Sequence, residues 1–317
     1  MNNDLRIVFF GTPDFAVASL KALIDAGKNV VAVVTTPDKP AGRGHKLQPS
    51  PVKEFAVEQN LPVLQPTNLK SEDFVGELAS YNANLQIVVA FRMLPEVVWN
   101  MPKHGTYNVH GSLLPDYRGA APINWAIING EKETGVTTFK LQHEIDTGNI
   151  LDQAKTAIGP NDSMGDLYPR LMHLGADLLL KSIANIESGK IELKPQPTPK
   201  QNTHAPKIFK ETCKIDLNKT AQEIHNFVRG MSPFPAAFLS VKLEDGNIEN
   251  WKILETRTTE LASDSSPSLH VNDNQLYLVC KDVLLEIKSV QTPGKKRLSS
   301  DDFLRGNRHD LSALTIT

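Results

Sequence analysis

The side chains of three residues could together transfer an acyl carbon to an amine. Asn108 and His110 lie in the segment 108–115, and Asp146 follows in the segment 143–148. A carboxamide can donate hydrogen bonds to a developing oxyanion, an imidazole can carry a proton, and a carboxylate can orient the imidazole. This set works without a covalent enzyme intermediate. The sequence has no nucleophilic Ser or Cys motif and no metal-ligand cluster that would indicate another chemistry.

The positions of these residues favour a shared site. Asn108 and His110 are two residues apart, so on an extended segment their side chains face the same side. They lie where a parallel strand is predicted to end, and open α/β sheets bind ligands outside the carboxyl ends of their strands. Each residue also has a structural interpretation. A His at a strand-to-loop turn is often structural, and an Asp before Thr-Gly commonly caps its own turn. The occurrence of all three together favours chemistry.

The composition describes a protein with a substantial buried core. The chain has 317 residues, of which 40% are hydrophobic and 22% charged, and its formal net charge is −2. This length predicts two domains. The apolar segment 7–10 is too short to span a membrane and lacks a signal-peptide profile. Cys213 and Cys280 lack a partner motif, so we expect two unpaired core thiols, a reducing compartment and a cytoplasmic location without a membrane partner.

Predicted strands and helices alternate through residues 5–188. The predicted strands are 5–10, 30–35, 63–64, 85–90, 105–114, 134–143 and 148–157. The predicted helices are 15–26, 52–59, 72–81, 123–129 and 167–188. This order indicates an α/β fold with a doubly wound, mostly parallel, Rossmann-like sheet. Gly11-Thr12-Pro13-Asp14 follows the first strand but is not the Gly-x-Gly-x-x-Gly fingerprint, which argues against a nicotinamide or flavin cofactor.

The pattern changes after the last of these helices. Residues 194–207 contain four prolines and several lysines, which predicts an extended, semi-rigid basic linker. A short helix at 221–229 then precedes strands predicted at 237–243, 251–258, 276–280 and 283–290. Short strands separated by turn residues are typical of a small β-barrel of the oligonucleotide-binding (OB) type. We therefore predict a first domain over 1–193, the linker over 194–207 and a β-barrel domain over 208–317.

The surroundings of the three residues resemble the 10-formyltetrahydrofolate-dependent transformylase family. The segments 108–115, 118–123, 135–137 and 146–148 match the family's signatures nearly residue for residue, and the resemblance covers essentially the whole chain. It implies that residues 1–193 form the formyltransferase catalytic domain, with Asn108, His110 and Asp146 as catalytic residues. It also implies that 10-formyltetrahydrofolate is the formyl-donor co-substrate and that no metal is needed. The residues expected to bind the folate are Ser112, Leu113, Leu114, Pro115, Phe91 and Arg92.

The last two of these residues depart from the family pattern. Phe91-Arg92 stands in the segment 90–95 where the family usually has Tyr-Gly, a segment expected to help line the folate pocket. Arg92 faces either solvent or the glutamate tail of the folate, and the sequence does not decide between them.

Two further segments resemble the members of the family that act on tRNA. The segment 36–53 resembles a loop that those members insert after the second strand, although it also reads as an ordinary Gly/Pro surface loop. The segments 227–237 and 293–298 resemble their tRNA-binding module. The resemblance implies formylation of the α-amino group of methionine on initiator methionyl-tRNA, for translation initiation. We expect a monomer. The residues expected to contact tRNA are Lys39, Arg43, Lys46, Lys207, Lys210, Lys295, Lys296 and Arg297.

Two alternatives stay open. The same three residues could formylate another amine, such as that of a sugar nucleotide or of glycinamide ribonucleotide. A glycinamide-type enzyme would have His-Pro-Ser in place of His110-Gly111-Ser112, and a sugar-nucleotide enzyme would lack the segment 37–53 in this form. The chain could also be a non-catalytic RNA-binding protein on an enzyme scaffold, although such a protein has no chemical reason to keep all three side chains.

Overall fold

The computed structural model of the chain describes residues 5–41, 46–199, 203–263, 266–307, 309–311 and 314–316. It contains two compact units. The first comprises residues 1–119, 133–156 and 168–204, and the second comprises 120–132, 157–167 and 205–317. The domain bounds predicted from the sequence, at 193 and 207, stay a prediction.

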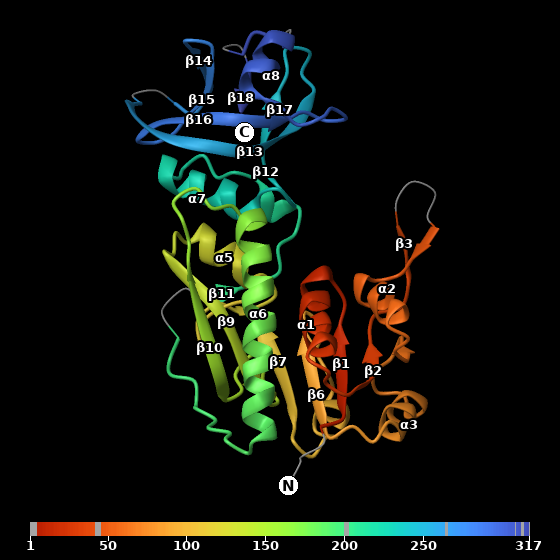
Figure 1. The fold of residues 1–317 in the computed structure, drawn as a ribbon. Helices are drawn as coiled ribbons and strands as arrows, with labels where there is room; N and C mark the ends of the chain where they lie inside the picture. The colour runs from red at the N-terminus through yellow and green to blue at the C-terminus, as the bar shows by residue number, and fades with distance from the viewer. Residues whose placement is uncertain are drawn as a thin grey trace. The chain divides into compact units, whose positions relative to one another are not determined.

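The first unit is built on a seven-stranded sheet in the order β10-β9-β7-β6-β1-β2-β5 (Figure 1). Its strands are β1 (Ile7–Gly11), β2 (Val30–Val34), β5 (Val63–Leu64), β6 (Leu85–Val89), β7 (Thr106–His110), β9 (Glu133–Lys140) and β10 (Ile150–Ala157). The strands from β7 to β5 pair in parallel, and β9 is antiparallel to β7. The predicted mostly parallel sheet is confirmed. Strand order reverses between β1 and β6, the position where such sheets bind ligands.

Helices cover both faces of this sheet. They are α1 (Asp14–Asp25), α2 (Pro51–Glu58), α3 (Glu72–Ser80), α4 (Glu96–Trp99) and α6 (Met164–Glu187). On one face, Phe74 and Leu78 of α3 share a buried apolar cluster with Val88 of β6. On the other face, Gly175 of α6 lies so close to β7 that an added Cβ would be 3.2 Å from Val109. The apolar strands predicted to be covered on both sides are therefore buried as expected.

The inserted segment after β2 contains a short hairpin. Strands β3 (Lys39–Ala41) and β4 (Lys46–Gln48) pair antiparallel, with Lys39 opposite Gln48. The sequence predicted only a loop here, because its Gly and Pro residues hide any alternation of apolar and polar residues. Two other short strands, β8 (Arg118–Gly119) and β11 (His204–Ala205), are also too short to give a sequence pattern.

The second unit contains a curled antiparallel sheet in the order β14-β15-β16-β13-β12-β18, with β17 paired to β16. Its strands are β12 (Ala237–Lys242), β13 (Ile248–Ala262), β14 (Leu269–Asn272), β15 (Gln275–Val279), β16 (Val283–Gln291), β17 (Leu298–Ser299) and β18 (Thr315–Ile316). This sheet agrees with the small barrel predicted for the C-terminal part. The sequence pattern did not predict β14, because Leu269 is the only buried residue of this strand.

Helices and buried side chains complete this unit. Its helices are α5 (Pro122–Ile128), η1 (Glu211–Cys213), α7 (Ala221–Met231) and α8 (Ser300–Gly306). Thr220 and Glu223 form a capping box at the start of α7. Cys213 and Cys280 are both buried and unpaired, as predicted, and burial raises the pKa of the Cys280 thiol to about 12.

The close packing of Gly135 generates a test of this fold. An added Cβ at Gly135 would lie 2.0 Å from the carbonyl oxygen of Ala154, whereas Gly76 on α3 has open space around it. We expect Gly135→Ala to destabilise the protein by at least about 1–3 kcal/mol through overpacking. Gly76→Ala should stabilise it by about 0.5–1 kcal/mol through helix propensity. Thermal unfolding of both variants checks this; equal melting temperatures would contradict the packing of β9 against β10.

Candidate active site

Asn108 and His110 project from the same side of β7, close to its carboxyl end. In the parallel register Asn108 lies opposite Val88 of β6. His110 is the last residue of the strand and is buried, whereas Asn108 is half-buried. Among the described residues, no hydrogen-bond partner is found for the Asn108 side chain. Its amide is therefore available to a ligand.

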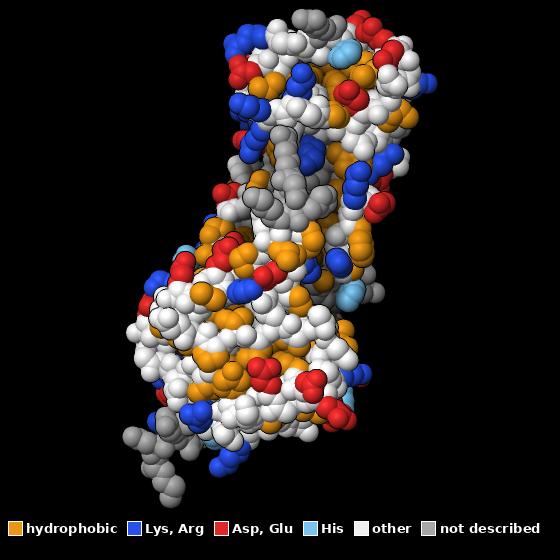
Figure 2. Space-filling view, turned by 90° about the vertical axis from the view of Figure 1, so that its right-hand side faces the viewer, with side chains coloured by type: hydrophobic (Ala, Val, Ile, Leu, Met, Phe, Trp, Pro, Cys, Tyr) orange, Lys and Arg blue, Asp and Glu red, His pale blue; other side chains and the backbone are white. Residues whose placement is uncertain are grey.

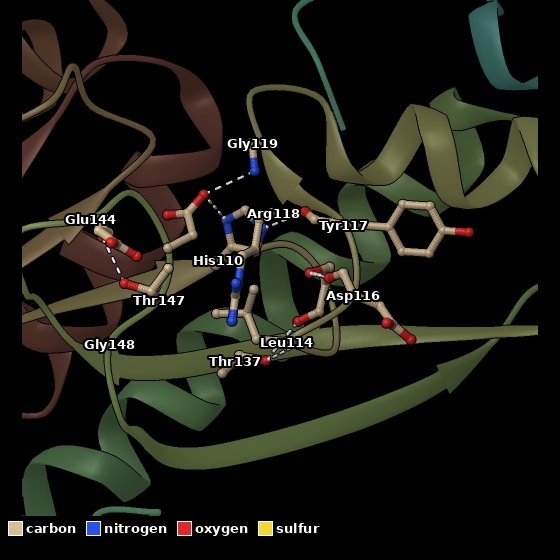
Figure 3. A network of polar contacts seen from close by, with 12 residues as sticks. His110, Leu114, Asp116, Tyr117, Arg118, Gly119, Thr137, Glu144, Thr147 and Gly148 are labelled. Atoms are coloured by element: carbon tan, nitrogen blue, oxygen red, sulfur yellow. Dashed lines mark hydrogen bonds and ion pairs between the residues drawn. The ribbon is translucent and has the colours of Figure 1, made fainter. Parts of the chain in front are cut away.

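His110 is oriented by the segment that follows the turn after β7. Its Nε2 atom lies 2.9 Å from the carbonyl oxygen of Tyr117 (Figure 3). A carbonyl oxygen can only accept, so Nε2 must carry the hydrogen. In the neutral imidazole the lone pair is therefore on Nδ1, and this atom lies 3.9 Å from Oδ2 of Asp146. The structure thus brings together His110 and Asp146, two of the predicted catalytic residues.

Asp146 is held in an uncommon backbone conformation. Its φ is +54°, a region that residues other than Gly seldom occupy. The Asp146 carboxylate accepts a hydrogen bond of 2.9 Å from the backbone N–H of Gly119. Next to it, an added Cβ at Gly148 would lie 1.8 Å from the carbonyl oxygen of Lys140. Only glycine at 148 lets the loop approach the end of β9 this closely, so the glycine two residues after Asp146 is a steric requirement.

The loop predicted to bind folate is fastened by a buried hydroxyl. Thr137 of β9 donates to the carbonyl oxygen of Ser112 at 2.7 Å and accepts from the backbone N–H of Leu114 at 3.1 Å. The Ser112 hydroxyl is also buried and donates to the carbonyl oxygen of Asp116. Leu114 is buried, and Leu113 and Pro115 are half-buried. These positions form the turn that carries the chain from His110 to Tyr117.

Sequence reasoning missed Gln196 as a site residue. Its Nε2 atom donates to the carbonyl oxygens of Asp146 and Gly148, at 2.8 Å each. Its Oε1 atom accepts from Nε and Nη2 of Arg118, at 3.1 and 2.6 Å. Gln196 lies in the Pro-rich segment that the sequence identified only as a basic linker. A glutamine among prolines and lysines carries no sequence signal for this role.

Phe91 and Arg92 take different positions at the carboxyl end of β6. The Phe91 ring packs edge-on against Phe10, with 5.7 Å between ring centroids. The Arg92 guanidinium donates to the carbonyl oxygens of Pro66 and Thr67. Arg92 is exposed, but these bonds tie it to the chain after β5.

Exposed apolar side chains lie around the Asp146 loop. Ile145 is exposed immediately before Asp146, and Met93 and Val97 are exposed around the start of α4. The two segments are in contact, since His143 Nε2 lies 3.4 Å from a carboxylate oxygen of Glu96. Apolar side chains exposed at such a loop indicate a surface that a flat apolar ligand could cover.

The residues predicted to contact RNA lie on several elements. Lys39 is exposed on β3, Lys46 begins β4, and Arg43 lies outside the described residues. At the base of this hairpin, hydrogen bonds from Lys53 and Gln65 hold the pKa of the Asp38 carboxyl below its usual value. The Lys53 ammonium is 2.7 Å from Asp38. These contacts hold the residue that precedes β3 against Lys53 of α2 and Gln65.

The predicted RNA contacts of the second unit are all exposed. Lys207 lies over the ring of Phe209, with Nζ 5.3 Å from the centroid, and Lys210 precedes the η1 turn. Arg297 is held by Ser289 and by Glu255, whose carboxylate is 2.9 Å from Nη2. The remaining two predicted contacts are Lys295 and Lys296. These residues come from two stretches of the chain, 207–210 and 295–297.

In the part of the chain that the structure describes, no group of three or more His, Cys, Asp or Glu side chains is arranged to hold a metal ion. No helix there combines the length and the apolar character needed to cross a membrane.

Comparison with protein families matches both parts of the chain. The formyl transferase family matches residues 5–183, and the C-terminal domain of formyl transferases matches residues 207–308. The methionyl-tRNA formyltransferase of Bacteroides fragilis is 50% identical over 308 residues, which cover 96% of this chain and 95% of the relative. That of Azobacteroides pseudotrichonymphae is 52% identical over 315 residues, with 97% of each chain covered.

Solved structures share the fold at lower identity. One is WlaRD, a sugar 3N-formyl transferase crystallised in the presence of dTDP and 5-N-formyl-THF. It has a TM-score of 0.64 and 22% identity, with 93% of this chain and all of that chain covered. Another is HypX from Aquifex aeolicus in complex with tetrahydrofolic acid, with a TM-score of 0.64 and 19% identity. That match covers 97% of this chain and 49% of HypX.

Proposed function

The chain belongs to the formyl transferase family, and we propose that it transfers the formyl group of 10-formyltetrahydrofolate to the α-amino group of methionine on initiator methionyl-tRNA. The observation that carries this proposal is about 50% identity to methionyl-tRNA formyltransferases over nearly the whole length of both chains. The bond that forms joins the amine nitrogen to the formyl carbon, and the bond that breaks joins that carbon to N10 of the folate. No electrons are exchanged.

Asn108 stabilises the charge that develops on the formyl oxygen. Its side-chain amide has no hydrogen-bond partner among the described residues, so it can donate without breaking an existing bond. It projects from the same side of β7 as His110, whose Nδ1 atom can act as a second donor once it has received a proton. Removal of one such donor typically costs about 3–4 kcal/mol of transition-state stabilisation.

His110 acts through its Nδ1 atom. Its Nε2 hydrogen is engaged by the Tyr117 carbonyl oxygen, so the proton that moves during the reaction is gained and lost at Nδ1. The attacking amine loses a proton and the leaving N10 requires one. Asp146 stands 3.9 Å from Nδ1, which is beyond direct hydrogen-bond distance, and acts on the imidazole through its charge and a bridging water molecule. The amine attacks neutral, a form that an α-amino group with a pKa near roughly 7.7–8.0 readily supplies.

The residues around Asp146 fit a folate. A pterin is a flat ring whose faces can stack on apolar side chains, and Ile145, Met93 and Val97 offer exposed apolar side chains next to the proposed catalytic loop. The half-buried Phe91, packed on Phe10, lies at the carboxyl end of β6 and can line the same site. Arg92 is bound to backbone carbonyl groups, which leaves part of its guanidinium available to the folate's glutamate tail. The bound folate supplies the formyl group; the other steps belong to protein side chains.

The tRNA partner is supported by the sequence identity to methionyl-tRNA formyltransferases and not by the net charge. Figure 2 shows Lys and Arg side chains interspersed with Asp and Glu on the face that it draws. Lys39 on the hairpin, together with Arg43 and Lys46, is proposed to contact the acceptor end of the tRNA. Lys207, Lys210, Lys295, Lys296 and Arg297 are proposed to contact its phosphates. A cytoplasmic location and a monomeric state remain predictions.

The competing amine substrate is weakly supported. A sugar formyl transferase shares the fold, but at 22% identity, so this likeness concerns the fold alone. The tRNA enzymes are more than twice as similar in sequence. Incubation with 10-formyltetrahydrofolate and methionine-charged initiator tRNA, elongator tRNA or a sugar-nucleotide amine distinguishes the two. We expect formylmethionine on the initiator tRNA; formylation of the sugar nucleotide alone would overturn the proposal.

Asp146→Asn tests the catalytic group. This change keeps the shape of the side chain but removes the charge that faces His110, so we expect kcat to fall by roughly 10²–10⁴-fold. The dissociation constant for the folate should change far less. The rate of formylmethionine formation and folate binding by calorimetry check this.

Glu144→Gln is the matched control, because Glu144 is an exposed acid of the same loop. It should keep turnover within about twofold of the wild type, since no carboxylate contact of Glu144 reaches His110. Near-normal turnover of Asp146→Asn would remove Asp146 from the chemistry.

Arg43→Ala tests the RNA contact of the hairpin. The change should raise KM for the charged tRNA while leaving folate binding unaltered. If Arg43 contacts one phosphate, the slope of log affinity against log salt should become shallower by about 1. Lys21→Ala is the control, because Lys21 is exposed and paired with Asp25 on α1. An unchanged KM and salt slope for Arg43→Ala would show that the hairpin assignment is wrong.

A further inference from the structure

The segment 117–119 supports both proposed proton-handling residues. The carbonyl oxygen of Tyr117 accepts from His110, and the backbone N–H of Gly119 donates to the carboxylate of Asp146 (Figure 3). Between them, Arg118 directs two donors at Oε1 of Gln196. The position of these three residues therefore sets the geometry of both His110 and Asp146.

Gln196 joins this segment to the turn that carries Asp146. It donates to the carbonyl oxygens of Asp146 and Gly148, 50 and 48 residues away in the chain. The hydrogen bonds form a closed ring, from Gln196 to Asp146, to Gly119, through the chain to Arg118 and back to Gln196. An amide has two donors and two acceptor positions, and all four are used here.

The turn needs such a clamp for a physical reason. Asp146 has a φ of +54°, and residues other than glycine seldom adopt this conformation in a loop that nothing else holds in place. Its carbonyl oxygen and that of Gly148 point to the same amide, so two backbone acceptors are satisfied by one side chain. Arg118 has no carboxylate partner among the described residues, and the neutral Gln196 oxygen supplies its acceptor. Arg118 therefore does not pair with the Asp146 carboxylate, which faces His110 and Gly119.

From these contacts we propose that Gln196 is a positioning residue for the transfer reaction, which holds the Asp146 turn and the 117–119 segment in register without touching the reacting atoms. This inference rests on the proposed function, because it assigns Gln196 an effect only through Asp146 and His110. It also gives the Pro-rich segment 194–199 a role in the site as well as in connection.

Gln196→Ala and Gln196→Glu test this role. We expect kcat to fall by about 10- to 100-fold, because misplacement of a reacting group by about 1 Å costs this order. KM for 10-formyltetrahydrofolate and for the charged tRNA should stay within about twofold. Gln196→Glu keeps the acceptor for Arg118 and loses the two donors, so it should lower kcat as well. Gln196→Glu also provides the test if the Gln196→Ala variant does not fold.

The double variant Asp146→Asn/Gln196→Ala separates positioning from general structure. If Gln196 acts through Asp146, the double variant should be no slower than Asp146→Asn alone. Thr198→Ala, an exposed change in the same segment, should leave kcat unchanged. Losses that multiply in the double variant, or a rise in KM at unchanged kcat, would overturn the inference. If Asp146→Asn itself has normal turnover, the catalytic assignment fails, whatever Gln196 does.

Discussion

The hydrogen bond between His110 and the Tyr117 carbonyl oxygen is the interaction on which the site depends. It assigns the hydrogen of the neutral imidazole to Nε2 and leaves Nδ1 as the atom that can gain a proton. Nδ1 is also the atom that faces the Asp146 carboxylate. A carbonyl acceptor therefore decides which nitrogen takes part in the chemistry, and the segment after residue 115 must be placed accurately for that choice to hold.

That placement uses close packing and shared acceptors. Thr137 fastens the turn between His110 and Tyr117, and Gly148 lets the Asp146 turn lie against β9. Gln196 joins the two segments. The sheet fixes only the start of this arrangement, since His110 is the last residue of β7. Loops that are held by buried hydrogen bonds, and not by regular structure, then carry the geometry to the reacting atoms.

The sequence was sufficient to predict the sheet, and the structure places His110 and Asp146 close together, while their catalytic role stays a prediction. The apolar strands β1 and β2 have no polar residue and β6 has one, the buried Gln86, and their parallel pairing follows from the helices between them. Gln196 and Thr137 could not be predicted, because an isolated polar side chain reveals its partners only after folding. The β3–β4 hairpin was missed for another reason, since its glycines and prolines are equally common in irregular loops. Local sequence patterns therefore do not predict contacts between segments that are distant in the chain.

The tautomer of His110 tests the central claim most directly. Nitrogen-15 NMR of the imidazole, assigned by comparison with a His110→Asn variant, distinguishes a protonated Nε2 from a protonated Nδ1 at a pH where the ring is neutral. The structure predicts that Nε2 carries the hydrogen and Nδ1 is bare. A neutral ring with its hydrogen on Nδ1 would contradict the account, because the atom that faces Asp146 would then already hold the proton it is proposed to receive.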